Sequence, residues 1–248
     1  MGLKWFCPFT ALLVLASWLH ADEGASARDV ARLAMKAMGG NRLAGAHAAT
    51  WKAKGTATIN GEEIEFDAKW AIQGERQLKI TADAQANGSA IKALILVNGD
   101  KGWAALAGLE EEMDKDRLAE EQERAYLDWL ATFVPLDDSR LKLTGLGESK
   151  VDGRAAVGIK VQRAGRRDVE LFFDKDKGLL LKSQMRVKDL MGGADVEQHV
   201  FYRDYKEQGG VPRATRVTYL WDKNPYLDMA VSGFKLHKKL PEKLFQKP

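Results

Sequence analysis

Histidine is the side chain in this sequence best suited to metal binding and to acid–base catalysis near neutral pH. After residue 21 the chain contains His47, His199 and His237, which lie far apart and lack a metal-binding spacing such as HxxxH. Neither a nucleophile elbow nor a glycine-rich phosphate loop is present. We interpret the histidines as isolated exposed or packed residues, and we expect no metal site and no cofactor.

Carboxylates gather in one stretch, where Glu62, Glu63 and Glu65 could supply the paired acids that hydrolases use. The alternation around them places Glu63 and Glu65 on the polar face of a strand that Glu62 opens. Solvation of that face explains these acids without any catalytic role. The sequence therefore predicts no catalytic residues and a protein that is not an enzyme.

The N-terminal residues 1–21 have the pattern of a secretory signal peptide. A lysine precedes the apolar run Trp5–Trp18, and Ala21 is a small residue suited to signal peptidase. A retained membrane anchor is the alternative, but the run contains Pro8 and is shorter than the roughly 20 residues that span a bilayer. We expect secretion across the inner membrane into the periplasm, cleavage near Ala21 and a single domain over 22–248.

Composition narrows the class of protein further. Of 248 residues, 45% are hydrophobic and 29% charged, which is ordinary for a globular protein with a sizeable core. Loss of Lys4 with the signal segment would leave 37 basic and 35 acidic residues, so no excess positive charge favours nucleic-acid binding. The single cysteine, Cys7, lies in that segment. The mature chain would therefore have no disulfide, no thiolate nucleophile and no cysteine metal site.

Two segments carry helical patterns. In the first, Ser26 and Asp29 fit a capping box and Gly39-Gly40 ends the helix. Its apolar residues at helical spacing are Val30, Leu33, Ala34, Ala37 and Met38. The second helix is expected from Glu110 to Phe133. Its apolar side consists of Leu118, Ala125, Tyr126, Trp129, Leu130 and Phe133. Its dense charges indicate either a solvated face or a charge-driven interaction site.

The rest of the chain alternates with the period of β-strands. Asn60-Gly61 is the favoured pair for a type I′ hairpin turn, and Asn98-Gly99, Asp152-Gly153 and Asp176 to Gly178 mark further turns. Consecutive hairpins predict an antiparallel sheet, and a sheet of this size curls, splits or closes. We expect a mainly β (α+β) fold, in which a strongly curved antiparallel sheet of about eleven strands forms an incomplete barrel with helices packed in its concave side. A closed ligand-binding barrel is the alternative.

Several stretches together resemble the LolA/LolB-like superfamily of exported lipoprotein carriers and lipid-binding domains. In chain order they are MKAMGGNRLA, VNGDKGWAAL, LFFDKDKGLLLK, YRDYKEQGGVPRATRVTY and LPEKLFQKP. The resemblance implies an unclosed barrel with helices as a lid and an apolar cavity that takes acyl chains, and it brings no catalytic motif. The family's receptor is itself a lipoprotein. Since the lipoprotein cysteine is absent, the chain is more similar to the soluble carriers.

An acyl chain would need a wide apolar lining rather than many hydrogen bonds. Burial contributes roughly 0.8 kcal/mol per CH₂, on the order of 12 kcal/mol for a sixteen-carbon chain before costs. The candidate lining residues are Phe66, Trp70, Leu94, Leu96, Trp103, Trp129, Phe133, Phe173, Val217, Tyr219 and Trp221. Ordinary core packing is the competing interpretation of each.

The hairpin FFDKDKGLLLK, Phe172 to Lys182, is apolar at every position of both flanks, whereas a half-exposed hairpin alternates. Gly178 fits its turn. One interpretation places both strands in the protein core. The other places helices or cargo on their concave face and chain segments on their convex face.

The expected ligand is therefore a lipid or lipoprotein acyl chain. An envelope membrane protein that donates or accepts this cargo is a further expected partner, and nucleic acid is not. The alternative function is an envelope scaffold that binds other proteins through a sheet edge or the charged helix and takes no ligand.

Overall fold

The computed structural model describes residues 22–86, 88–189 and 193–247, so the signal-peptide prediction for 1–21 lies outside the described residues. The described part contains two α-helices, α1 (Asp22–Ala37) and α2 (Lys115–Leu130), and three short 3₁₀ turns, η1 (Gly40–Arg42), η2 (Val134–Asp137) and η3 (Glu242–Phe245). Its strands are β1 (Ala48–Ile59), β2 (Glu62–Gln73), β3 (Gln77–Ala86), β4 (Ser89–Asn98), β5 (Lys101–Leu106), β6 (Leu109–Glu112), β7 (Lys142–Val151), β8 (Arg154–Gln162), β9 (Val169–Asp174), β10 (Leu180–Lys188), β11 (Asp195–Gln208), β12 (Val211–Trp221) and β13 (Asn224–His237).

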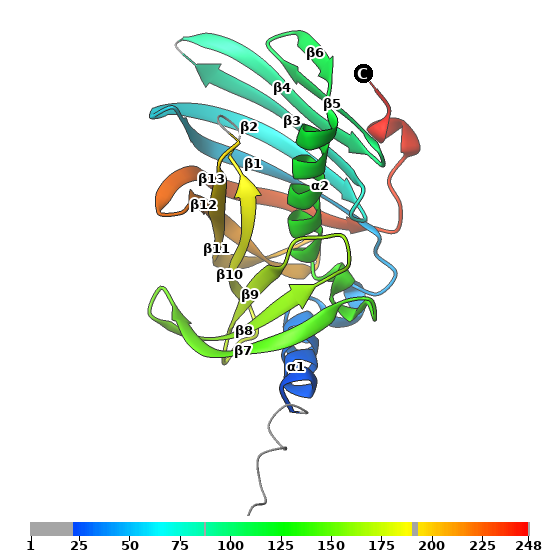
Figure 1. Cartoon of the computed structure of the whole chain (residues 1–248), viewed down its shortest axis with the longest axis vertical. Helices are drawn as coiled ribbons and strands as arrows, with labels where there is room; N and C mark the ends of the chain where they lie inside the picture. Colours follow the sequence, from blue (N-terminus) through cyan, green and yellow to red (C-terminus); the bar gives the residue numbers. More distant parts are fainter. Residues whose placement is uncertain (1–21, 87, 190–192, 248) are drawn as a thin grey trace, which may run out of the picture.

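All thirteen of these strands form one antiparallel sheet in the order β6-β5-β4-β3-β2-β1-β13-β12-β11-β10-β9-β8-β7. Every neighbouring pair is also consecutive in sequence except β1 and β13, which we call the seam. The seam pairs Ala48 with His237 and Ala57 with Leu227. The edge strands β6 and β7 do not pair with each other, so the curved sheet stays open (Figure 1). This confirms the predicted incomplete barrel, with two strands more than the expected eleven.

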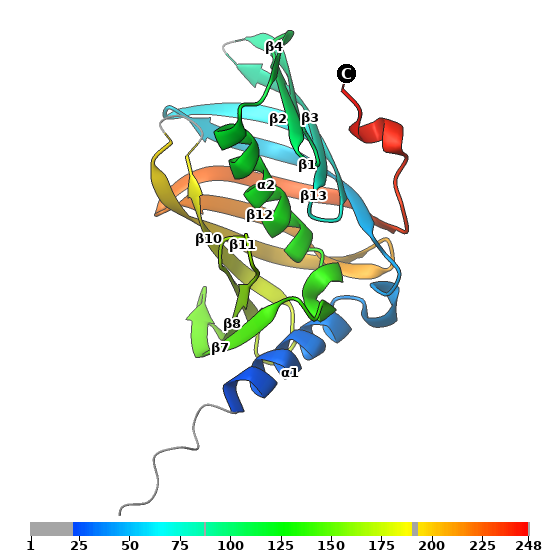
Figure 2. The same ribbon diagram turned by 45° about the vertical axis from the view of Figure 1, so that its right-hand side comes forward.

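Helix α2 links the two free edges and crosses the concave side of the sheet, whereas α1 packs against β7 and β8 (Figure 2). Helix α2 was predicted to begin at Glu110. This start is wrong, because Leu109–Glu112 forms strand β6, which pairs with β5. The turn at Ala107 and Gly108 has positive φ angles and closes a hairpin, which overrides the helix-forming composition. The helix starts after Asp114, whose carboxylate accepts a hydrogen bond from the Arg117 backbone N–H at 2.8 Å. None of the described helices has the length and apolar character that a membrane span requires.

Helix α1 also differs from the prediction. It begins at Asp22, four residues before the proposed cap Ser26. Its buried stripe consists of Ala27, Ala31 and Ala34, and Met38, the first residue after the helix, is buried as well. Leu33, which was expected on this stripe, is 64% exposed. The small alanines let the helix approach β7 closely.

The two faces of the sheet are covered differently. On the concave face α2 packs over Ile72, Leu78 and Val97, and on the convex face the C-terminal segment places Leu240 and Phe245 over other strand residues. The carboxyl end of the chain therefore acts as a second layer on the outside of the sheet (Figure 2).

The apolar hairpin Phe172 to Lys182 has both faces in contact with other side chains. Leu171 and Phe173 are 1% exposed and belong to the main core on the concave side. On the convex side Phe172 packs with Leu181, Val151, Ala156 and Phe201 from the same and neighbouring strands. The structure thus fits burial of both strand faces. The turn has Gly178 at a φ of +67°, and a Cβ there would lie 3.1 Å from Ala37 Cβ.

Candidate ligand-binding cavity

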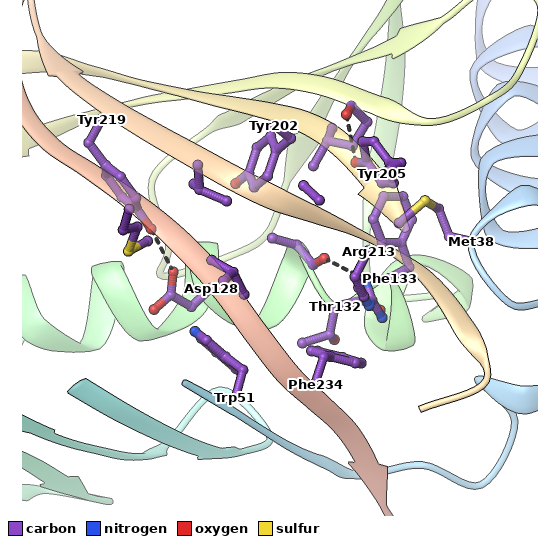
Figure 3. A pocket seen from close by; sticks show the side chains of 16 residues that line it. Met38, Trp51, Asp128, Thr132, Phe133, Tyr202, Tyr205, Arg213, Tyr219 and Phe234 are labelled. Atoms are coloured by element: carbon purple, nitrogen blue, oxygen red, sulfur yellow. Dashed lines mark hydrogen bonds between the residues drawn. The ribbon is translucent and has the colours of Figure 1, made fainter. Parts of the chain in front are cut away.

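A cavity of about 80 Å³ lies on the concave side, between the C-terminal end of α2 and strands β1 and β10–β13 (Figure 3). It is lined by Met38, Trp51, Asp128, Ala131, Thr132, Phe133, Leu180, Tyr202, Tyr205, Arg213, Ala214, Val217, Tyr219, Met229, Val231 and Phe234. Strand alternation aims the strand residues inward, and the helix supplies the opposite wall. Most of this lining is aliphatic or aromatic, with a few polar groups among it.

One wall of the cavity is a column of stacked rings. Trp51 lies between Trp70 and Phe234, with ring centroids 6.0 and 6.3 Å apart and nearly parallel planes. The Arg213 guanidinium continues the column, 3.9 Å from the centre of the Phe234 ring and 5.8 Å from that of Phe133. Such stacked planes make a rigid apolar wall.

Arg213 is a buried cation at the end of α2. Its Nη1 donates to the Ala131 carbonyl at 3.2 Å and its Nη2 to the Thr132 carbonyl at 2.8 Å. A positive charge at a helix C-terminus is favourable, because the free carbonyls there carry partial negative charge. Burial lowers the pKa of Arg213 to about 10, so the group stays charged at neutral pH. Arg213 therefore ties the end of α2 to β12.

Asp128 contributes a carboxyl group from α2. The Tyr219 hydroxyl donates to its Oδ1 at 3.5 Å, a long hydrogen bond. Burial raises the pKa of Asp128 to about 7, because the cavity solvates a negative charge poorly and supplies no cation beside it. The group therefore binds a proton more tightly than a solvated aspartate does.

Two further hydroxyl groups in the lining are already engaged. Tyr205 donates to the Leu180 carbonyl at 2.7 Å, and the Tyr202 hydroxyl lies 3.1 Å from the Ser183 hydroxyl. Burial raises the pKa of both phenols, so they remain neutral. Their rings extend the apolar wall.

No protein-family model and no curated protein matches the chain. Several solved structures have a similar fold. A DUF1329 family protein from Desulfovibrio piger has a TM-score of 0.56 at 13% identity, with 90% of this chain and 97% of that chain covered. A putative outer membrane lipoprotein-sorting protein domain from Vibrio parahaemolyticus has a TM-score of 0.55 at 13% identity, with the same coverage. A LolA superfamily protein from Nitrosomonas europaea has a TM-score of 0.55 at 14% identity, with 89% and 97% covered.

The chain has a LolA-like fold. The likeness spans nearly the whole described chain, and it confirms at the level of fold the resemblance that the sequence indicates.

Three of the predicted lining residues, Phe133, Val217 and Tyr219, line the cavity of this LolA-like fold. Trp70 and Phe173 stand directly behind the lining, since Trp70 stacks on Trp51 and the Phe173 ring centre lies 6.0 Å from that of Phe133. Phe66 and Trp221 are half-buried against the same core. Trp221 stacks on Tyr226 with ring centres 3.8 Å apart.

The other four predicted residues pack elsewhere. Trp129 lies in a neighbouring concave cluster under α2, with Ile72 and Leu78. Leu94, Leu96 and Trp103 share the convex face, where the C-terminal segment covers them. The structure therefore does not bring these four into the cavity.

The acid–base candidates also stay apart from the cavity. His47 is exposed, His237 Nε2 lies 2.9 Å from the Thr50 hydroxyl, and His199 Nε2 lies 3.3 Å from a Glu197 oxygen. The side chains of the three glutamates at the start of β2 are exposed. Within the described ranges, no three histidine, cysteine or acidic side chains are grouped so that they could hold a metal ion.

Sequence reasoning missed Arg213, Asp128 and Trp51. Trp51 could have been found, because it alternates with Ala49 and Ala53 on one strand face. Arg213 and Asp128 gave no such signal, since a charged residue in a strand or helix is usually solvated.

Proposed function

We propose that the protein is a non-enzymatic periplasmic carrier or binding protein for the acyl chains of lipids or lipoproteins. The observation that carries the proposal is the aromatic and aliphatic cavity under α2, in the hollow of an open sheet. Two structures with the same fold are described as a lipoprotein-sorting domain and a LolA superfamily protein, which supports this class of cargo. An envelope membrane protein would deliver or receive it.

The cavity is too small in this closed state to hold a long acyl chain. Its volume of about 80 Å³ compares with roughly 300–1,000 Å³ for pockets that enclose small-molecule ligands. Binding therefore needs α2 to move away from the sheet. Because this helix is not part of the strand ladder, its displacement breaks no pairing between strands.

Ion pairs hold the outer side of α2. Arg166 lies 3.2 Å from Glu123 on the helix and 4.0 Å from Glu75 in the β2–β3 turn. Arg167 in the same β8–β9 loop pairs with Glu120 on the helix. The side chains of these pairs are only 11–32% exposed, so opening of the helix has to break them. We assign α2 the role of a lid.

The carrier function predicts that acyl ligand accompanies the protein. We expect native mass spectrometry after non-denaturing purification to show one lipid per protein molecule, and release of the ligand by organic solvent should identify its acyl chain. A protein that is empty, and that takes up no lipid from vesicles of mixed bacterial phospholipid, would contradict the carrier. That result would favour the scaffold.

Locking the lid should block ligand exchange. We expect a Glu120→Cys, Arg167→Cys variant joined by a short bismaleimide to exchange a fluorescent fatty acid at least about tenfold more slowly, because α2 can no longer leave the sheet. The same variant without the linker should exchange at least as fast as the unmodified protein, because it lacks the ion pair between Glu120 and Arg167.

The matched control for this experiment is a second cross-linked pair away from the lid. Lys54 and Asp67 form an exposed ion pair between β1 and β2, at 2.8 Å, and their cysteine variants can receive the same linker. All variants carry Cys7→Ser to remove the native thiol. Equal exchange rates for the two linked proteins would refute the lid role of α2.

A further inference from the structure

The charge of Arg213 lacks an anionic partner in the part of the chain that the structure describes. The side chain is 6% exposed, and no carboxylate there forms an ion pair with it. Two carbonyl oxygens and two aromatic rings stabilise it only in part. A buried charge without a counter-ion is costly to the folded protein.

The donors of this guanidinium are also incompletely used. Nη1 and Nη2 bind the Ala131 and Thr132 carbonyls, while Nε is buried and has no hydrogen-bond acceptor among the described residues. Arg213 lines the cavity, beside Phe133 and Phe234 (Figure 3). A guanidinium with spare donors at a cavity wall favours an oxyanion, since carboxylate and phosphate match its planar donor geometry.

The remainder of the lining is largely apolar, and it would face a single apolar chain once α2 has moved away from the sheet. Val217, Met229 and Val231 line it together with the ring of Trp51. Asp128 and Tyr219 lie at the opposite side of the view from Arg213 (Figure 3). A ligand anion would therefore meet one positive group, with apolar walls beyond it.

We infer that the cavity takes a single-chain lipid with an anionic head, a carboxylate or a phosphate monoester, and that Arg213 binds this head while the chain lies along the apolar walls. The inference rests on the proposed acyl-binding function and adds the class of ligand.

Three ligands of equal chain length test the inference on the unmodified protein. Dodecanoate, dodecyl phosphate and 1-dodecanol are titrated below their micelle-forming concentrations, with calorimetry and tryptophan fluorescence as readouts, because Trp51 lines the cavity. We expect at least one anion to bind at least about tenfold more tightly than the alcohol, as a charged hydrogen bond in a buried site would give. The anion that binds more tightly identifies the head group.

If the alcohol binds as tightly as both anions, the inference fails and acyl binding stands. If none of the three binds, the proposed function fails as well.

Substitutions test whether Arg213 causes the preference for an anionic ligand over the alcohol. We expect Arg213→Gln to lose the preference for an anion over 1-dodecanol, and Arg213→Lys to keep most of it. Arg216→Gln is the matched control. Arg216 lies on β12, as Arg213 does, but its side chain is exposed and forms an ion pair with Asp228 on β13. Should the glutamine variant fail to fold, the comparison of ligands on the unmodified protein decides alone. An anion preference that persists in a folded Arg213→Gln protein would contradict the role of Arg213.

Discussion

Replacing Gly55 with alanine is expected to lower the free energy of unfolding by about 3 kcal/mol or more. Gly55 pairs with Met229 in the seam, the one strand pairing that joins β1–β6 to β7–β13. A Cβ at this position would contact the Asp228 carbonyl oxygen and lie 2.7 Å from Met229 Cα. Both atoms belong to the backbone, so the clash can be relieved only if the seam opens.

Urea unfolding followed by tryptophan fluorescence measures this effect, and Gly74→Ala is the matched control. Gly74 lies in the β2–β3 turn with a φ of +58°, and no atom lies within 4 Å of the position of its added Cβ. Its substitution should cost about 1 kcal/mol, from backbone strain alone. Equal losses in the two variants would show that the seam tolerates a side chain at Gly55.

The second large effect concerns pH. Asp128→Asn is expected to leave stability unchanged near pH 4 and to raise the free energy of unfolding at pH 8, by at most about 4 kcal/mol. The pKa of Asp128 rises from 3.8 to about 7 on folding, chiefly through burial. The folded protein therefore holds a proton that the unfolded chain has lost. Stability contributed by this group is complete below pH 3.8, falls as pH rises toward 7 and is absent above it.

Comparing the unmodified protein with the Asp128→Asn variant separates the effect of Asp128 on stability from that of other titratable groups. Tyr219 and Tyr202 face it from the sheet, and Glu121 lies on the same helix with a pKa also raised by burial, but all three are present in both proteins. Denaturation curves at pH 4, 6 and 8 should diverge progressively. Parallel curves across this range would mean that the carboxyl is solvated. Above pH 7 ionised Asp128 weakens the contact of α2 with the sheet, so ligand exchange should also become faster.

Local signals in the sequence account for much of the fold. Asn60-Gly61 and Asp152-Gly153 have the positive φ angles that such turns require, and each closes a hairpin as predicted. Helix α2 was predicted from its composition, although its start was not, because the short hairpin before it depends on pairing with β5. The seam could not be predicted, since it joins residues at opposite ends of the chain.

The site was harder to predict than the fold. Strand β4 is apolar on both faces, so alternation could not assign Leu94 and Leu96 to the convex side, where the C-terminal segment covers them. Phe133, Val217 and Tyr219 do line the cavity, and their role in ligand binding stays a prediction. Arg213 and Asp128 become visible only through their three-dimensional neighbours, because in sequence they look like surface charges.

The order of strands also determines when the domain can be completed. Within each half of the sheet every strand pairs with its neighbour in sequence, so both halves can assemble early through short loops. The seam pairs Ala48 with His237 and must close a loop that contains most of the protein, which is the slow step in a topology of this kind. Until β13 arrives, β1 is an unpaired edge at the middle of the future sheet. An incomplete chain therefore exposes the unpaired backbone groups of the 12-residue strand β1, which the complete sheet pairs on both sides.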